Sequence, residues 1–515
     1  MTGTDGADAL PLLPGARAQI RRIAADLEGG LHCLWLLPDT LVASGQGDEL
    51  YRAVLRTQPD RLDLPGPAVP GPGPASEYGP GPGLGLEPGP GVGGGAAGGS
   101  PPGPPPADLP VLEGYDDGFD IGWQPVVPRP RAPAPRRGED PADLVARLAK
   151  ELSVAPGEVL ARLTDRSAHW RPVIGVRAWQ EPAPRAAPGR APERGRDVAR
   201  LVRSLTAAVK EAGLPLDRRP RLLVLARASD LPAALPDESE LDLGAAAVHW
   251  WWGTVGRLDA ATVVAEAADD RAARPRPGPG GALRERIRRA VREEIIAEVS
   301  GPDLALARRL ASHWDGSDRT LDRCLRDSLD PDLGRLAAAC RSVAGEAVAG
   351  HKPGSALRDA WSRGAVQAWE GRLRHHPAGW YADGPEHRPD ELTALVGHAQ
   401  QRVLLPWIEE VRRRLARLAP AWASRPVAQL VEAYVQRPPA DHRTRPERAF
   451  ETVEVGPMLT AHLRGDLALP PEEAQLLREL VTARNVLSHR GVLYDARLHA
   501  LCDAIAAADR RWLRL

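Results

Sequence analysis

Short apolar runs alternate with amphipathic segments in the first part of the chain. Nearly continuous apolar runs occupy residues 31–38, 171–179, 219–227 and 245–253, as expected for strands that are buried on both faces of a parallel sheet. Residues 195–213 show helical spacing of apolar side chains and end at a glycine. Because strands that alternate with helices favour parallel pairing, this pattern predicts an α/β module built on a parallel sheet.

Glycine and proline interrupt this module. The chain contains 51 Gly and 53 Pro, and they concentrate in residues 65–139. Such a segment buries too little apolar surface to offset its ordering entropy, so we expect a disordered linker that loops out of the sheet. Within it, VLEGYDDGFDIGW (residues 111–123) gathers three aromatic residues and several acids. This segment is either an incidental apolar patch or a docking peptide for a partner.

Strand patterns largely disappear after residue 281. The remaining apolar positions follow helical spacing, including separate helical segments at 391–405 and 407–419 on either side of Pro406. The fold class that we predict is an α/β N-terminal module, interrupted by the linker and followed by an all-α C-terminal half. The corresponding regions are 1–64 and 140–280 for the α/β module, 65–139 for the linker, 281–355 for a helical extension and 356–515 for an all-α domain.

Composition and charge argue against function classes that depend on a strong overall charge or on membrane insertion. The 67 Lys and Arg residues nearly balance 68 Asp and Glu, so no global charge attracts nucleic acid or membrane. Arginine far outnumbers lysine, as in proteins from GC-rich, actinobacterial-type genomes, which weakens any functional interpretation of a single arginine. The N-terminus has no basic start, and no apolar run of 18 residues occurs. We therefore expect a cytoplasmic protein that does not contact a membrane.

The sequence provides no recognisable set of metal or cofactor ligands. Four widely spaced cysteines form no CxxC pair, so neither a disulfide framework nor a zinc site is predicted. A phosphate-binding loop needs a Lys followed by Ser or Thr, yet the three lysines precede Glu151, Glu211 and Pro353. The segment after the first strand contains Gly45 and Gly47 but no basic residue. We therefore expect no cofactor and no nucleotide hydrolysis.

The order of elements nevertheless resembles the AAA+ and STAND NTPase architecture over residues 31–316. Residues 173–181 would occupy the Walker B strand, 221–232 the sensor strand, and 247–258 the last strand before a helical lid. Glu181 would take the position of the Walker B acid, although Pro182 follows it. The resemblance implies a degenerate, non-hydrolysing regulatory module. An unrelated α/β domain is the alternative.

The strongest motif lies near the C-terminus, in LVTARNVLSHRG (residues 480–491). Asn485 is the only asparagine of the chain, and it follows Arg484. Asn485 and His489 are four residues apart and so lie on one face of a helix. The same R-x4-H spacing occurs at residues 308–313 and 437–442, but without the asparagine or this place in an amphipathic helix one helix before the C-terminus.

This segment resembles the R-x4-6-H motif of the HEPN superfamily, with Arg484, Asn485 and His489 at the matching positions. The resemblance, over residues 390–515, implies a four-helix domain that binds RNA or cleaves it without metal. The RNA 2′-hydroxyl would attack the adjacent phosphate, while the His assists proton transfer and the Arg stabilises the developing charge. It also implies a homodimer and protein partners within a bacterial conflict or stress system.

Other interpretations remain open from the sequence. Arg484, His489 and Arg490 are also suited to complement the dipole at a helix C-terminus before a glycine, in which case the whole chain would be a non-catalytic adaptor. HWWWG (residues 249–253) is expected to pack at a sheet edge or domain interface, with a base-stacking platform as the alternative. Residues 375–376 and 380–381 are expected in a loop between helices.

Overall fold

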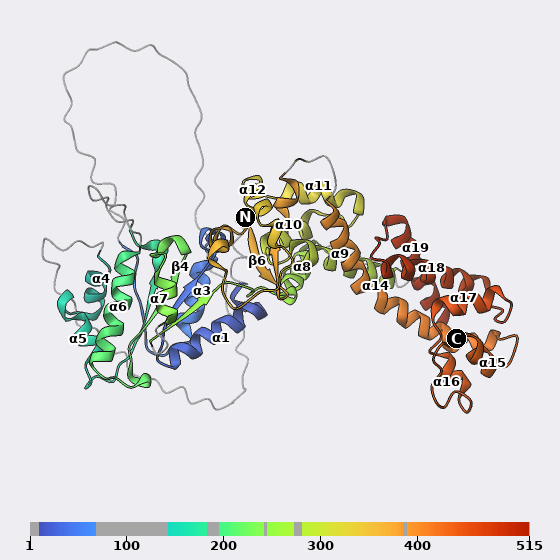
Figure 1. The fold of residues 1–515 in the computed structure, drawn as a ribbon, viewed down its shortest axis with the longest axis horizontal. Coiled ribbons are helices and arrows are strands. Elements are labelled where there is room, and N and C mark those ends of the chain that lie inside the picture. The colour runs from blue at the N-terminus through green and yellow to red at the C-terminus, as the bar shows by residue number, and fades with distance from the viewer. Residues whose placement is uncertain are drawn as a thin grey trace, which may run out of the picture. The chain divides into compact units, whose positions relative to one another are not determined.

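The computed structural model describes residues 10–67, 143–182, 195–241, 245–271, 281–382, 384 and 389–513 (Figure 1). The predicted linker lies outside these ranges except for residues 65–67, and the candidate docking peptide at 111–123 lies wholly outside them.

A five-stranded parallel sheet forms the centre of the N-terminal module, as predicted. Its strand order is β2-β3-β4-β1-β5. The strands are β1 (His32–Leu36), β2 (Arg61–Asp63), β3 (Val173–Arg177), β4 (Arg221–Ala226) and β5 (Ala246–Trp250). Four of them lie within the apolar runs of the sequence. The fifth, β2, has only three residues of alternating exposure, too few to give a recognisable strand pattern.

Strand β1 lies inside the sheet, between β4 and β5. Cys33 is in register with Leu223 on one side and with Ala247 on the other, and all five residues of β1 are buried. The segment before the linker therefore belongs to the same sheet as the strands after it, as the apolar run at 31–38 predicted.

Helices cover both faces of the sheet (Figure 1). The chain moves across the sheet in one direction from β1 to β2 and in the opposite direction from β2 to β5. Because crossovers between parallel strands are right-handed, these two sets of connections lie on opposite faces. One face carries α1 (Pro14–Glu28) and α3 (Gln46–Arg56), and the other carries α4 (Leu144–Leu152), α5 (Val159–Thr164) and α6 (Arg196–Glu211). The short helices α2 (Asp39–Ala43) and α7 (Leu235–Leu241) lie in the connections after β1 and β4.

The chain beyond the sheet is mostly helical, as predicted. Its helices are α8 (Arg257–Arg271), α9 (Ala282–Ser300), α10 (Leu304–His313), α11 (Asp318–Ser328), α12 (Pro331–Ala339), α13 (Arg358–Ser362), α14 (Asp390–Leu418), α15 (Val427–Tyr434), α16 (Pro446–Phe450), α17 (Val455–Leu463), α18 (Pro471–Ser488) and α19 (Asp495–Trp512).

One hairpin departs from the all-α expectation. Strands β6 (Val366–Trp369) and β7 (Arg372–His375) pair antiparallel around Glu370 and Gly371, both of which have positive φ. Tight two-residue hairpin turns require positive φ at such positions, and the usual sequence signals for them are Asn-Gly and Asp-Gly. Glu-Gly is not one of these signals, so the hairpin was not predicted. The expectation of a loop was therefore wrong for His375, which lies buried in β7.

The prediction of two helices on either side of Pro406 is also wrong. Helix α14 runs through Pro406 without a break for 29 residues. Proline inside a helix removes one backbone hydrogen bond and crowds the preceding turn. Extensive packing of α14 against α9 and α18 compensates for this loss, and such tertiary contacts are not visible in a local sequence pattern.

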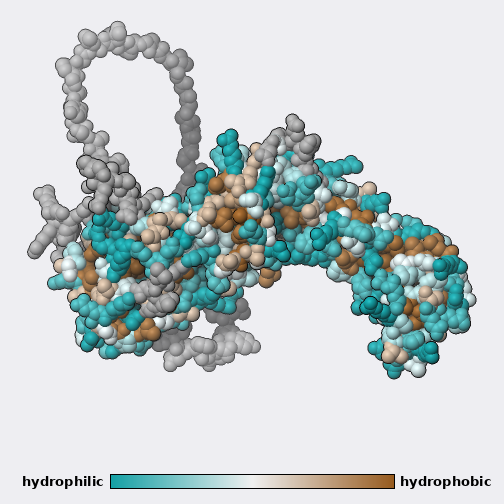
Figure 2. All heavy atoms as spheres, viewed as in Figure 1, coloured by the Kyte–Doolittle hydropathy of each residue, from teal (hydrophilic) through white to brown (hydrophobic). Residues whose placement is uncertain are grey.

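Apolar side chains form two large buried clusters among the described residues. The first surrounds the sheet and includes Trp361, Val366 and Trp369 of the α13–β7 region. The second lies between the helices from α8 to α19. On the face drawn in Figure 2, hydrophilic residues predominate and apolar residues occur in separate patches. Within the described ranges, no helix has the length and apolar character needed to cross a membrane.

Candidate functional site

The RN-x3-H segment lies at the C-terminal end of α18. Pro471 begins the helix at a position where its missing N–H costs nothing, and Glu472 and Glu473 follow in the first turn, where negative charge is favourable. Leu476, Leu480, Leu487 and other apolar residues of α18 are buried. They face α14, α17 and α19. The amphipathic helix predicted around the motif is therefore present.

The three motif residues lie close to solvent at this helix end. Helix α18 ends at Ser488, and His489 is its C-cap residue, whose backbone N–H donates to the Asn485 carbonyl oxygen at 3.2 Å. The side chains of Asn485 and His489 are exposed, whereas Arg484 is partly buried. The structure thus brings Asn485 and His489 one turn apart at an accessible site.

The chain turns sharply just after this site. Arg490 adopts the left-handed conformation with φ of 58°. Its N–H donates to the Leu487 carbonyl at 3.0 Å, and the Gly491 N–H donates to the Val486 carbonyl at 2.8 Å. These two bonds define a Schellman motif, which satisfies the last carbonyl groups of a helix. The C-terminus of α18 is therefore capped by backbone bonds and does not depend on the His489 ring.

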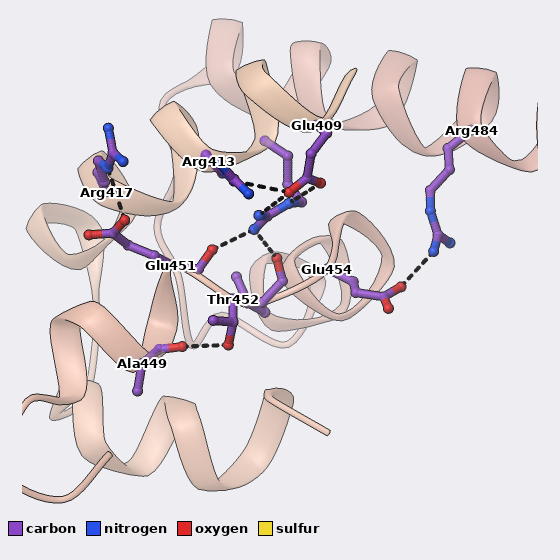
Figure 3. A network of polar contacts seen from close by, with 10 residues as sticks. Glu409, Arg413, Arg417, Ala449, Glu451, Thr452, Glu454 and Arg484 are labelled. Carbon is purple, nitrogen blue, oxygen red and sulfur yellow. Dashed lines mark hydrogen bonds and ion pairs between the residues drawn. The ribbon is translucent and has the colours of Figure 1, made fainter. Parts of the chain in front are cut away.

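The Arg484 guanidinium contacts a neighbouring element. Arg484 Nη2 donates to Glu454 Oε2 at 2.8 Å, and both side chains are about half exposed (Figure 3). Glu454 is the residue immediately before α17. Ion pairs this exposed contribute about 0–1 kcal/mol because water and salt screen them. A polyanion such as RNA, with many closely spaced phosphates, can therefore compete for Arg484 at small cost.

A second set of ionic contacts fixes the segment that carries Glu454. The buried Arg412 guanidinium donates to both carboxylate oxygens of Glu409, at 2.8 and 2.7 Å, and to the carbonyl oxygens of Glu451 and Val453 at 2.6 and 2.7 Å (Figure 3). Hydrogen bonding to Arg412 lowers the pKa of Glu409 below its usual value. Arg412 thereby ties the chain before α17 to α14, and this places Glu454 opposite Arg484.

The other two R-x4-H sequences have different surroundings. The ring of His313 is already engaged locally, since Nδ1 lies 2.8 Å from the Arg309 carbonyl oxygen. Residues 437–442 lie between α15 and α16 and do not form a helix, and His442 Nδ1 lies 2.8 Å from the Pro439 carbonyl oxygen. These two segments therefore serve as matched controls for the segment in α18.

The turn after β1 and the residue Glu181 do not have the form of a nucleotide site in the described part of the α/β module. After β1 the chain passes through Pro38 directly into α2, without a glycine-rich turn. Glu181, which the NTPase resemblance places at the Walker B acid, forms a nearly buried ion pair with Arg147 at 2.5 Å. Burial of the carboxylate raises the pKa of Glu181, and this effect is larger than the lowering caused by Arg147. Glu181 thus serves a structural ion pair in this module.

A cavity of about 360 Å³ lies beyond the carboxyl ends of β1 and β5, where open α/β sheets bind ligands. Its wall combines apolar residues such as Leu13 and Trp251 with Arg308 and Arg363. Two buried polar atoms in the lining, Ser300 Oγ and His375 Nε2, have no hydrogen-bond partner among the described residues. Because the lining comes from distant parts of the chain, no local sequence pattern indicates this cavity.

The tryptophans of HWWWG pack inside the protein. Trp250, Trp251 and Trp252 are all buried. The Trp250 ring meets Trp361 edge-on at a centroid distance of 5.2 Å, and Trp251 lies 5.9 Å from Trp35. The expected packing role is confirmed for all three rings, and Trp251 also forms part of the wall of the cavity beyond β1 and β5.

One group of potential metal ligands is present in the described part of the chain. Asp26, Cys33 and His249 place one ligand atom each within 4.8 Å of one another. These residues come from α1, β1 and β5, so their spacing in the sequence conceals the cluster.

No protein-family model matches the sequence, and no curated protein or solved structure is significantly similar to the chain.

Proposed function

We propose that this protein is a component of a bacterial conflict or stress system whose C-terminal helical region binds RNA and cleaves it without metal. The observation that carries this proposal is the accessible placement of Arg484, Asn485 and His489 together at the end of α18. Since backbone bonds already cap this helix, His489 and Asn485 remain available for chemistry.

The chemistry assigns a distinct role to each residue. His489 would accept the proton of the RNA 2′-hydroxyl as that oxygen attacks the adjacent phosphate. The bond from phosphorus to the 5′-oxygen then breaks, and the leaving 5′-oxygen takes up the proton that His489 holds. Arg484 would leave Glu454 and stabilise the charge that develops on the phosphate oxygens. Asn485 would hydrogen-bond the substrate beside them. On the basis of the HEPN resemblance, we infer that two chains face each other across the RNA in a homodimer through this C-terminal region.

The α/β module would regulate this activity without hydrolysing a nucleotide. Two observations support this role. Glu181 forms an ion pair with Arg147, and the turn after β1 is not a glycine-rich loop of the kind that binds phosphate. The cavity beside β1 and β5 provides a place for a small regulatory ligand.

The proposal is tested by incubating the full-length protein with single-stranded RNA in the presence of EDTA. We expect cleavage that leaves 2′,3′-cyclic phosphate ends, and a loss of about 100-fold in rate for Arg484→Ala, the size typical for removal of one charge-stabilising group. Arg437→Ala, which alters the control sequence at residues 437–442, should retain the activity of the unchanged protein. Equal loss in Arg484→Ala and Arg437→Ala, or cleavage that EDTA abolishes, would contradict the assignment.

A second candidate function is a non-catalytic adaptor, and the Arg484–Glu454 ion pair favours it. In an adaptor, Arg484 would connect α18 to α17 and have no other role. Arg484→Ala would then lower the melting temperature slightly, and neither the variant nor the unchanged protein would bind RNA.

A further inference from the structure

Three residues with metal-binding side chains meet on the α1 face of the sheet. In the parallel pairing of β1 and β5, Cys33 is opposite Ala247 and Trp35 is opposite His249. Because side chains alternate between the faces of a sheet, Cys33 and His249 point to the same face. That face is covered by α1, since Cys33 Sγ contacts the Ile23 carbonyl oxygen at 3.8 Å. Asp26, one turn further along α1, completes the cluster.

The ring of His249 is held in place from one side and faces the other two residues of the cluster from the other. The amide nitrogen of the buried Gln19 lies 3.1 Å from His249 Nδ1 and fixes the ring. The buried Nε2 lies 2.9 Å from Asp26 Oδ2. In a metal-binding histidine, one ring nitrogen usually forms a hydrogen bond that fixes the ring, and the other nitrogen is directed at the metal and its remaining ligands. His249 has this arrangement, with Asp26 and Cys33 as the remaining ligands.

The donor set and its spacing suit zinc. Thiolate, imidazole and carboxylate are the three protein ligands of Zn²⁺. Tetrahedral coordination with bonds of about 2.0–2.3 Å separates ligand atoms by roughly 3.3–3.8 Å. The three atoms already lie within 4.8 Å of one another, so small side-chain rotations bring them to that spacing. The Asp26 side chain is 37% exposed, which gives solvent and metal a route to the site.

We propose that Asp26, Cys33 and His249 bind one zinc ion, with water at the fourth position, and that the ion connects α1 to strands β1 and β5. The proposal is independent of the function assigned to the C-terminal region. It predicts a metal-stabilised α/β module, because the three ligands come from elements far apart in the chain.

Binding requires two proton rearrangements. Zinc binds the thiolate form of cysteine, so the Cys33 thiol releases its proton to solvent when the ion binds. With Gln19 donating to Nδ1, the imidazole proton resides on Nε2. Coordination by Nε2 moves this proton to Nδ1, and the Gln19 amide turns so that its oxygen accepts.

Cobalt substitution gives the most direct test. The full-length protein is freed of metal, titrated with Co²⁺ and followed by absorption spectroscopy, and Zn²⁺ is then added as a competitor. We expect one Co²⁺ per chain, a thiolate-to-cobalt charge-transfer band, and displacement by Zn²⁺. Cys33→Ser should lose the band, whereas Cys340→Ser, which removes another buried free cysteine, should keep it.

A second variant keeps the test valid if Cys33→Ser fails to fold. Asp26 is partly exposed, so Asp26→Asn should fold normally and weaken Zn²⁺ binding at least about tenfold. Zinc should also raise the melting temperature of the unchanged protein and of Cys340→Ser. Absence of stoichiometric binding, a charge-transfer band that persists in Cys33→Ser, or unchanged zinc affinity in Asp26→Asn would each overturn the proposal.

Discussion

His489 and Asn485 occupy positions where polar side chains contribute little to the fold. Both are exposed, and the cap of α18 consists of backbone hydrogen bonds. The sequence could predict the helix and its end, because the apolar spacing and Gly491 mark them. It could not predict Glu454 as the partner of Arg484, since these residues are 30 positions apart and meet only after α17 packs on α18.

Glu409 gives a pH-dependent prediction at the scale of single residues. Its pKa is lowered by hydrogen bonding to Arg412, so the folded state favours the ionised carboxylate. The resulting stability is fully present above the pKa of Glu409 in the unfolded chain and is lost as the pH falls through the lower folded-state value. Glu409→Gln removes this contribution. For a half-exposed carboxylate, we expect the free energy of unfolding at neutral pH to fall by roughly 1 kcal/mol.

The measurement is the melting temperature of both proteins as a function of pH. We expect Glu409→Gln to melt lower at pH 7 and the difference to shrink as the medium becomes more acidic than the normal pKa of glutamate. A difference that stays constant down to strongly acidic pH would show that the carboxylate charge is not responsible.

The secondary-structure elements that pattern analysis located best are those with strong, continuous periodicity. Strands β1, β3 and β4 are nearly all apolar because both of their faces are covered, whereas β5 is apolar but lies at the sheet edge and is only partly buried. The elements that it missed depend on other forces. Strand β2 is too short, and the β6–β7 hairpin depends on a Glu-Gly turn and on burial of Val366 and Trp369 against the sheet core.

Helix α14 provides a prediction at the scale of elements. Pro406 is exposed in the helix interior, where proline costs up to about 3 kcal/mol relative to alanine. We expect Pro406→Ala to stabilise the protein by about 1–3 kcal/mol in denaturant unfolding. Pro471→Ala should have little effect, because Pro471 begins α18 at a position that tolerates proline. Destabilisation by Pro406→Ala would mean that packing of α14 requires the local distortion that proline introduces.

Across the whole molecule, some candidate sites can be predicted from the sequence and others cannot. The three motif residues of α18 are nearly contiguous, so their spacing shows them. The cavity beside β1 and β5, and the Asp26–Cys33–His249 cluster, combine residues from distant segments. These residues come together only when the parallel sheet and its helices have formed. A local sequence pattern therefore cannot predict that they are neighbours.

Nucleotide binding tests the regulatory role of the whole α/β module. Because Pro38 leads directly into α2 and Glu181 is paired with Arg147, Mg-ATP should bind no more tightly than about 1 mM, roughly −4 kcal/mol. Isothermal titration calorimetry on the full-length protein measures this. Low-micromolar affinity, roughly −8 kcal/mol, would show that the module is a functional nucleotide-binding unit.

The most direct test of the central claim compares the RNA cleavage rate of His489→Ala with its melting temperature. The His489 side chain is exposed and plays no part in the backbone cap, and exposed substitutions usually change stability by less than about 0.5 kcal/mol. We therefore predict an unchanged melting temperature together with loss of RNA cleavage in EDTA. Full cleavage activity in His489→Ala, or no cleavage by the unchanged protein, would contradict the proposed function.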